Sequence, residues 1–504
     1  MSEVMIAMGK YSVPEKIRNL KPQGTMVKKI RGGYYVYNYS SKQVSFVDEK
    51  GVKHWKTKTS MGGCIGMITE KDGFVPNEGH ISKDAITCRN YGDYAFTIEK
   101  SKHTYDRLCE VFHPDDARQI YSASVIFFVD GFTYMTSMKD KYDISYLPLV
   151  YDKVQLGYDA LHTLYKNLGT RTARIHKFEE SMIEHSSKSI AIDGHVIACT
   201  SECNDLSEFG YKASKLGTEQ INWITAYDVN DGCPLFSSLC SGADPDKISV
   251  KVIFDRHKFT NTEFLVDRGF NTEEDKKLMS SNGNTFIVPM ISNRDDYKSV
   301  VDVLKFDKRN YFIYDKDGYS SMIYYQAFRS GDDKKRYIAF KDTTREGAER
   351  KSYVEALSEG RKGYSEEGLV ENELLFGLFL LETNNFEAAP RTIFEHYKSR
   401  WSIETYYNYV RNDVDFNALY QQDYFCMQGL SFIVTVSGII YHEMKKQTDI
   451  SKLPLKKTMR EMKKLKISLE GDKWLVKNKI KSVREIAEKV GFEIPKYIPK
   501  VSST

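Results

Sequence analysis

The stretch Ser189-Ile190-Ala191-Ile192-Asp193-Gly194 is a short apolar strand that ends in an acid and a glycine. A second strand of the same kind, Glu263-Phe264-Leu265-Val266-Asp267, follows 74 residues later and also ends in an acid. Between and after them lie two strands around a turn (221–239), a helical pattern (272–281) and a further strand (285–291). Alternation of short apolar runs with helical periodicity predicts a mixed α/β sheet over residues 189–291.

The segments outside this core differ in pattern. Residues 25–80 carry β hairpin signals, residues 104–125 and 152–184 are helical, and residues 311–340 form a β meander that reads as an inserted module. Helical periodicity runs from Pro390 to about residue 446. We expect an N-terminal α+β domain at 1–150 and a catalytic core split into 151–300 and 371–445. A β-rich insertion at 301–370 separates the two parts of the core, and a basic helical region follows at 446–504.

Length and composition limit the class of protein. The chain has 504 residues, with 41% hydrophobic and 28% charged residues, which excludes a mainly disordered chain and a multi-span membrane protein. The longest apolar stretch, Leu430–Tyr441, is too short to span a bilayer and predicts a buried helix. Met1 to Val13 has no signal-peptide pattern, and the eight cysteines form no C-x-x-C pair. These features predict a cytoplasmic protein with reduced thiols and no zinc site.

Charge is unevenly distributed along the chain. Residues 445–504 contain 17 Lys/Arg against 7 Asp/Glu, a net +10, although the whole chain carries only +4. A basic run at Lys456, Lys457, Arg460, Lys463, Lys464 and Lys466 could follow a polyanion such as DNA. A solvated, lysine-rich helical surface explains the same charge equally well.

Three acids form the candidate catalytic set. Asp193 and Asp267 end core strands, and Glu404 lies in the helical run 391–411. Carboxylates that converge at one sheet edge repel one another unless a divalent cation binds, and oxygen ligands suit Mg²⁺ or Mn²⁺. Two such ions would stabilise both oxygens of an in-line phosphoryl displacement. The alternative for each aspartate alone is a turn former or helix cap, and for Glu404 a surface ion pair.

The helical run adds a geometric hypothesis. In an unbroken helix at about 100° per residue, Tyr397, Arg400, Glu404 and Arg411 fall within a stripe of roughly 60°. A carboxylate flanked by guanidinium groups and a phenol suits a phosphodiester. Trp401 is expected to anchor the helix in the core.

These residues carry a resemblance to a known family. The pattern Tyr397-x2-Arg400-x3-Glu404-x6-Arg411 resembles the Tyr-Arg-Glu-Lys signature of bacterial insertion-sequence DDE transposases, the insertion-sequence-four superfamily. Leu265-Val266-Asp267-Arg268-Gly269-Phe270 resembles the family's second-aspartate motif, and Ala191-Ile192-Asp193-Gly194 its first. The resemblance covers about residues 185–440.

The resemblance implies an RNase H-like mixed-sheet core with a β-rich insertion. It implies that Asp193, Asp267 and Glu404 bind two Mg²⁺ ions, with Mn²⁺ as a substitute, and that Tyr397, Arg400, Arg411 and Arg268 contact DNA. The enzyme would bind terminal inverted repeats as a homodimer, cleave the strands and join the 3′ ends to target DNA, in a bacterial cytoplasm at the nucleoid and without a membrane.

Two departures from the family pattern leave questions open. Arg411 stands where the family has lysine, and arginine keeps the charge but changes the donor geometry. None of the four tryptophans (55, 223, 401, 474) lies in the insertion, where some relatives hold a flipped base. Tyrosines of the insertion could stack on a base instead, and ordinary strand packing is the alternative for them; they are Tyr311, Tyr314, Tyr319, Tyr324 and Tyr325.

Other functions remain alternatives at this point. A metal-dependent DNA nuclease on the same core needs the same carboxylates and metals. A domesticated, non-catalytic DNA-binding protein predicts the loss of at least one acid, whereas all three are present. A carbohydrate- or peptide-binding protein gives no reason for the stripe of Tyr397, Arg400, Glu404 and Arg411.

Overall fold

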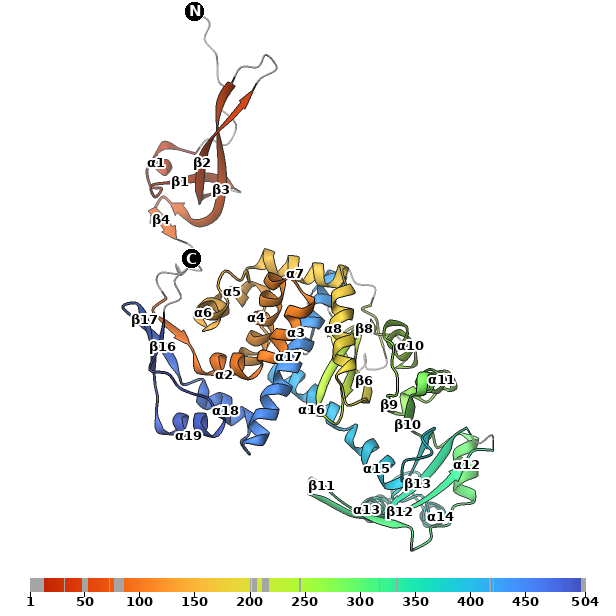
Figure 1. Ribbon diagram of the computed structural model, residues 1–504. Coiled ribbons are helices and arrows are strands. Elements are labelled where there is room, and N and C mark those ends of the chain that lie inside the picture. The colour runs from red at the N-terminus through yellow and green to blue at the C-terminus, as the bar shows by residue number, and fades with distance from the viewer. Residues whose placement is uncertain are drawn as a thin grey trace, which may run out of the picture. The chain divides into compact units, whose positions relative to one another are not determined.

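The computed structural model divides into two compact units, Met1–Thr87 and Cys88–Thr504 (Figure 1). The residues that it describes are 13–30, 32–47, 53–71, 73–76, 86–199, 201, 206–210, 217–243, 246–316, 318–331, 334–416, 418–419 and 421–499. The sequence also predicts turns at residues 48–51, 317–318 and 330–333; the first lies outside the described residues, and the other two lie partly outside them.

The first unit is a small antiparallel sheet with one helical turn. Its strands pair in chain order, and its elements are α1 (Glu15–Arg18), β1 (Thr25–Ile30), β2 (Gly33–Val47), β3 (Lys53–Thr69) and β4 (Gly73–Pro76). Ile17, Val36 and Ile68 form its buried centre. The β hairpins expected between residues 25 and 80 are therefore present, and two of the strands are unusually long.

The second unit is built on a mixed sheet, so the expected mixed α/β class is confirmed. The strand order is β11-β12-β13-β14-β10-β9-β6-β7-β8, with β15 (Ala418–Leu419) also paired to β6. Strands β6, β9 and β10 run parallel, β15 is also parallel to β6, and the other neighbours in the sheet are antiparallel. The bounds are β6 Ser189–Cys199, β7 Gln220–Asp228, β8 Cys233–Ser241, β9 Glu263–Val266, β10 Thr285–Pro289, β11 Tyr311–Lys316, β12 Tyr319–Arg329, β13 Arg336–Asp342 and β14 Leu378–Thr383.

Helices cover the β6–β8 part of this sheet. They are α2 Gly92–Lys100, α3 Lys102–Val111, α4 Pro114–Asp130, α5 Met135–Ile144, α6 Leu147–Val150, α7 Tyr158–Thr170, α8 Ala173–Glu184 and α17 Tyr424–Ile450. The long helix α17 packs on α4, α7 and β8, and Trp223 of β7 donates its indole N–H to Ser431 Oγ at 2.9 Å. Because both groups are buried, this bond satisfies a polar indole that would otherwise cost free energy in the core.

The helix α17 contains the apolar stretch 430–441, and the prediction of a buried helix there is confirmed. It is the one helix among the described residues that is long and apolar enough to cross a membrane by composition, and 78% of its apolar window is buried inside the protein. Burial of this kind is what the central helix of a globular fold requires.

The β meander at 311–340 is part of the central sheet. Strand β13 pairs with β14, which pairs with β10, so β11–β13 extend the sheet at one edge. The helices α12 (Asp295–Asp302), α13 (Thr343–Ser358) and α14 (Glu366–Glu371) lie in the same segment. The segment expected as a β-rich insertion thus lies between β10 and β14 in the chain, and its strands join the central sheet. Local turn and strand signals cannot reveal which existing strand a hairpin will join.

The C-terminal region is not purely helical, which corrects the expected basic helical segment. After α18 (Leu455–Met462) come β16 (Lys466–Glu470), β17 (Lys473–Lys477), α19 (Lys481–Lys489) and β18 (Tyr497–Pro499). These strands form a sheet in the order β18-β17-β16-β5, whose last member is β5 (Cys88–Asn90) at the start of the same unit. Phe492 closes the arrangement by packing on Tyr91 and Phe96, with ring centroids 6.5 and 5.7 Å away.

Several lysines of the C-terminal basic run are paired with acids inside the fold. Lys456 Nζ lies 2.6 Å from Asp413, and Lys463 Nζ lies 3.2 Å from Asp130. Lys464 Nζ lies 2.6 Å from Glu461. Neutralised lysines attract a polyanion less strongly, so these pairs favour the alternative of a solvated surface for this part of the run.

A buried ion pair joins a helix to the sheet beside β10. Lys276 of α11 (Glu273–Met279) places Nζ 2.9 Å from both carboxylate oxygens of Glu382 on β14, and their side chains are only 2% and 1% exposed. Glu273 also reaches Lys276 Nζ, from the exposed side. Removing one member of a buried pair leaves a desolvated charge without its partner, which is costly.

The substitution Glu382→Gln is expected to lower the free energy of unfolding by about 2–3 kcal/mol, because Lys276 remains buried with Glu273 as its main acceptor. Denaturant unfolding followed by circular dichroism measures the change. The matched control is Glu485→Gln, which removes an exposed pair with Lys481 and should change stability by at most about 0.5 kcal/mol. Equal effects of the two substitutions would contradict the account.

Candidate active site

Asp193 and Asp267 lie side by side on neighbouring parallel strands. The register pairs Ala191 with Leu265 and Ile192 with Val266, so the next position on each strand is an aspartate. Asp267 keeps an extended backbone (φ −86°, ψ 175°) just after β9 ends. Paired strands lie about 4.8 Å apart, and aligned residues of a parallel pair point to the same face. The two carboxylates are therefore neighbours at one place on the sheet.

Asp267 follows its strand as predicted, whereas the prediction that Asp193 ends its strand is wrong. Strand β6 continues to Cys199 and stays paired with β7 as far as Ala198. On its other side β9 stops at Val266, and the next pairing is that of β15 with Ala198 and Cys199. Asp193 thus stands where one neighbour of β6 has ended, a property that its own sequence neighbourhood does not encode.

Two short helices cross from β9 to β6 beside these aspartates. On α15 (Pro390–Ser399), His396 Nδ1 bonds to the carboxylate of Glu263 at the start of β9, and this bond raises the pKa of His396. On α16 (Ser402–Asn408), Tyr407 donates its hydroxyl to the Asp193 carbonyl oxygen at 2.7 Å. The Tyr407 ring also stacks on His195, with centroids 5.0 Å apart. The first contact holds α15 against the start of β9, and the Tyr407 contacts hold α16 at Asp193.

Glu404 reaches the same region through α16. It lies three residues before Tyr407, and residues three apart share one face of a helix. Its side chain is partly exposed. The structure therefore places Glu404 about one turn from Tyr407, whose hydroxyl contacts the Asp193 carbonyl oxygen.

Arg400 lies buried between α15 and α16 near both aspartates. Its side chain is only 8% exposed, and its Nε has no hydrogen-bond partner among the described residues. Burial acts to lower the pKa of Arg400, but Tyr397, Asp267 and Asp193 outweigh it and raise the pKa. Burial likewise raises the pKa of Tyr397, whose neighbours include Arg400, Asp267 and Arg268. One guanidinium, one phenol and two carboxylates thus share one electrostatic environment.

The chain from Tyr397 to Arg411 is not one continuous helix. This corrects the hypothesis that Tyr397, Arg400, Glu404 and Arg411 form a stripe along an unbroken helix. Three-residue hydrogen bonds link Arg400 to Tyr397 at 3.2 Å and Glu404 to Trp401 at 3.0 Å, so the chain tightens between α15 and α16. A π-helical turn, Tyr409–Asp413, follows α16. Tight and π turns inside a helix often occur at functional sites, and both change the angle between residues on either side.

Arg411 and Trp401 lie differently from the expectation. Arg411 is exposed on the π-helical turn and donates to Asn408 Oδ1 at 2.7 Å. Trp401 is 64% exposed, so its expected role as a core anchor is wrong. The tightened turn at Arg400 explains this exposure, because it rotates Trp401 away from the helix face on which Ile393 and Ile403 are buried. Arg268 is exposed beside Asp267.

The donor chemistry of the three acids fits a divalent cation, while their arrangement does not yet enclose one. Carboxylate oxygens are the ligands that Mg²⁺ and Mn²⁺ prefer. Among the described residues, no three Asp, Glu, His or Cys side chains come close enough together to hold a metal ion.

Comparison with known proteins decides the class. A family described as transposase DDE domain matches residues 184–420, which include both aspartates and Glu404. The matched segment is similar to this family over just under half of the chain. The protein is thus an enzyme of the DDE transposase type, and the predicted enzyme class is confirmed.

Two further comparisons complete the findings. A solved structure of the piggyBac transposase synaptic complex with hairpin DNA is similar to this chain at 12% identity and a TM-score of 0.38, covering 75% of this chain and 80% of that chain. No curated protein matched the chain.

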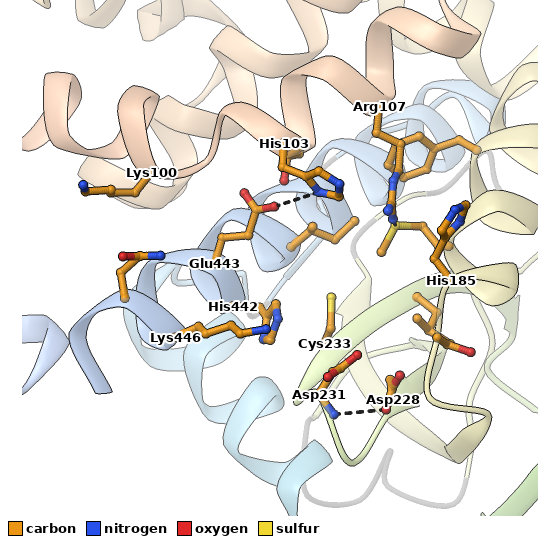
Figure 2. Close-up of a pocket in the computed structure, with 17 residues that line it drawn as sticks. Lys100, His103, Arg107, His185, Asp228, Asp231, Cys233, His442, Glu443 and Lys446 are labelled. Atoms are coloured by element: carbon orange, nitrogen blue, oxygen red, sulfur yellow. Dashed lines mark hydrogen bonds and ion pairs between the residues drawn. The ribbon is translucent and has the colours of Figure 1, made fainter. Parts of the chain in front are cut away.

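A separate cavity of about 400 Å³ lies against the DDE domain, where β6 begins (Figure 2). Residues of α3, α8, the β7–β8 turn and α17 line it, and they carry both charges; they include His103, Arg107, His185, Asp228, Asp231, His442, Glu443 and Lys446. Asp228 is occupied in holding the turn, since it accepts hydrogen bonds from the backbone N–H groups of Ser187, Asn230 and Asp231. No sequence pattern indicates this cavity, because its walls come from segments that lie far apart in the chain.

Glu443 is the unusual group of this cavity. Burial raises its pKa to about 7, against the lowering effect of Thr104, Arg107 and Lys446. Its Oε1 lies 3.4 Å from His103 Nδ1, and its Oε2 has no hydrogen-bond partner among the described residues. A carboxyl with a raised pKa holds its proton longer in the folded state than in the unfolded state.

Glu443→Gln should therefore change how stability depends on pH. Between pH 4.5 and 7 the folded wild type binds more protons than the unfolded chain, so its stability falls as the pH rises through this window. Glutamine does not titrate, so the variant lacks this loss. The free energy of unfolding of the variant minus that of wild type should therefore be larger at pH 8 than at pH 4, by on the order of 2–3 kcal/mol. Urea unfolding at several pH values measures this. Parallel curves for the two proteins would contradict it, and the exposed Glu110→Gln serves as control.

Proposed function

We propose that the protein is a cut-and-paste transposase of the insertion-sequence-four superfamily, with Asp193, Asp267 and Glu404 as its catalytic acids. The observation that carries this proposal is the register of β6 and β9, which sets the two aspartates side by side within a transposase DDE domain. The strand order β8-β7-β6-β9-β10, antiparallel first and then parallel, supports an RNase H-like core. The signature residues Tyr397, Arg400 and Glu404 support the superfamily.

Each residue has a role in this proposal. Asp193, Asp267 and Glu404 would hold two Mg²⁺ or Mn²⁺ ions, which supply Lewis-acid activation of the nucleophile and stabilise the leaving oxygen. The buried Arg400 guanidinium lies close to both aspartates and offers bidentate donors to a DNA phosphate. Tyr397 positions that guanidinium through its phenol. Arg268 and Arg411 are exposed and would contact the DNA backbone.

The proposed substrates are double-stranded DNA ends with terminal inverted repeats and a target duplex. A homodimer would hold the two ends together, in the cytoplasm at the nucleoid. The proposed division of labour gives residues 1–150 to DNA-end binding, 151–300 with 371–445 to catalysis, and 446–504 to a basic accessory region. The segment 301–370 extends the catalytic sheet.

The substitutions Asp193→Asn, Asp267→Asn and Glu404→Gln should each abolish DNA cleavage, by at least about 10³-fold, and leave DNA binding largely unchanged. The substrate is a duplex carrying the ends of the DNA that flanks the gene, with Mg²⁺ added, and gel electrophoresis measures cleavage. The matched control is Glu395→Gln on α15, whose carboxylate forms an exposed pair with Arg391. Full cleavage by any of the three variants would remove that residue from the catalytic set.

A second assay separates transposase from nuclease. Wild-type protein is given pre-cleaved ends with free 3′-hydroxyls and a supercoiled target plasmid. A transposase joins the ends to the plasmid, whereas cleavage of DNA without any joined product would identify a nuclease. Short inverted repeats bracketed by direct repeats around the gene are the expected genomic context.

A further inference from the structure

The N-terminal unit carries a long two-stranded ribbon. Strand β1 pairs with β2 only over Gly33–Asn38, and β4 pairs with β3 only over Gly66–Thr69. Beyond these points, from Tyr39 paired with Met61 to Val47 paired with Lys53, the two strands pair only with each other. Nine residues at about 3.3 Å each give a ribbon of roughly 30 Å, which extends from the sheet of its unit in Figure 1.

This ribbon has no core of its own. Wherever the exposure of its side chains is described, they are exposed, with Tyr39 at 42% and Trp55 at 64%. The buried residues of the unit, Ile17, Val36 and Ile68, all lie outside the ribbon. An isolated two-stranded ribbon is marginally stable in water, so a surface that covers it would add to its stability.

The charge of the ribbon has one sign. Residues 39–47 and 53–61 contain four lysines and no Asp or Glu. The register pairs Lys42 directly with Lys58, and like charges at opposed positions destabilise a strand pair unless an anion lies nearby. The whole unit, residues 1–87, has 14 Lys/Arg against 8 Asp/Glu, a net +6 in a chain whose total is +4. The ribbon is therefore complementary to a polyanion.

The residue types on the ribbon alternate with the period of a strand. One set of alternate positions contains Lys42 and, on the partner strand, His54, Lys56 and Lys58. The other set carries one charge, Lys53, and is rich in hydroxyl and amide groups; it also contains Ser41, Gln43, Ser45, Trp55, Thr57 and Thr59. Lysines neutralise phosphates, and hydroxyl and amide groups bond to phosphates and base edges. The major groove of B-form DNA is about 12 Å wide and admits a two-stranded ribbon.

We propose that this ribbon, residues 39–47 paired with 53–61, is a duplex-DNA-binding arm that enters the major groove. The inference rests on the proposed function, since it gives the DNA-joining enzyme a second contact with its substrate, outside the DDE domain. Its lysines supply affinity that depends strongly on salt. The arm gains stability from the duplex that covers it.

The test measures binding of the full-length protein to a 30-base-pair duplex by fluorescence anisotropy, in EDTA so that no cleavage occurs. The arm variant combines Lys42→Gln, Lys53→Gln, Lys56→Gln and Lys58→Gln. Each lost phosphate contact reduces the slope of log affinity against log salt by about 0.9, so the slope should become shallower by about 3–4. A matched control combines Lys177→Gln, Lys258→Gln, Lys351→Gln and Lys362→Gln, all exposed in the second unit, and should keep the wild-type slope.

Each outcome decides the proposal. An arm variant with the wild-type slope and a wild-type thermal transition overturns it, and so does a single-stranded competitor that displaces the protein better than duplex. An acidic polypeptide that competes as well as duplex also overturns it. The binding assay contains no metal, so failure of wild-type protein to join DNA ends would refute the proposed transposition and leave the arm result standing.

Discussion

The parallel, in-register pairing of β6 with β9 is the constraint on which the site depends. Residues 190–192 and 264–266 are apolar and fully buried, so both faces of the sheet are covered here, and a one-residue slip of either strand would force the closely packed core on both faces to repack. The same register sets the residues that follow, Asp193 and Asp267, beside each other. The hydrophobic core thus holds two like charges together, an arrangement that is stable only with a compensating cation nearby.

Compensation in this structure comes from the protein itself. Arg400 is buried beside the aspartates, and a tightened turn between α15 and α16 brings it there. Tyr407 holds α16 on β6 through the Asp193 carbonyl oxygen, and the Asp193 carboxylate accepts a hydrogen bond from the backbone N–H of Gly194 at 2.9 Å. One cationic side chain can neutralise part of the charge of the two aspartates.

Much of this could be predicted from the sequence where the signal is local. The strand before Asp267, the mixed sheet and the buried helix at 430–441 follow from runs of apolar residues with clear ends. The errors arise where distant pairing decides. Asp193 lies within a strand because β9 stops beside it, and Trp401 is exposed because a tight turn rotates it. The β meander joins the central sheet because β13 meets β14, and no local pattern specifies a partner strand.

The most direct test is anomalous X-ray diffraction from crystals of the full-length protein grown with Mn²⁺. The account predicts anomalous peaks between the carboxylates of Asp193 and Asp267, with Glu404 moved in to complete the coordination. Two results would contradict the central claim. One is manganese bound elsewhere and none between Asp193 and Asp267; the other is Asp193 and Asp267 on opposite faces of the sheet.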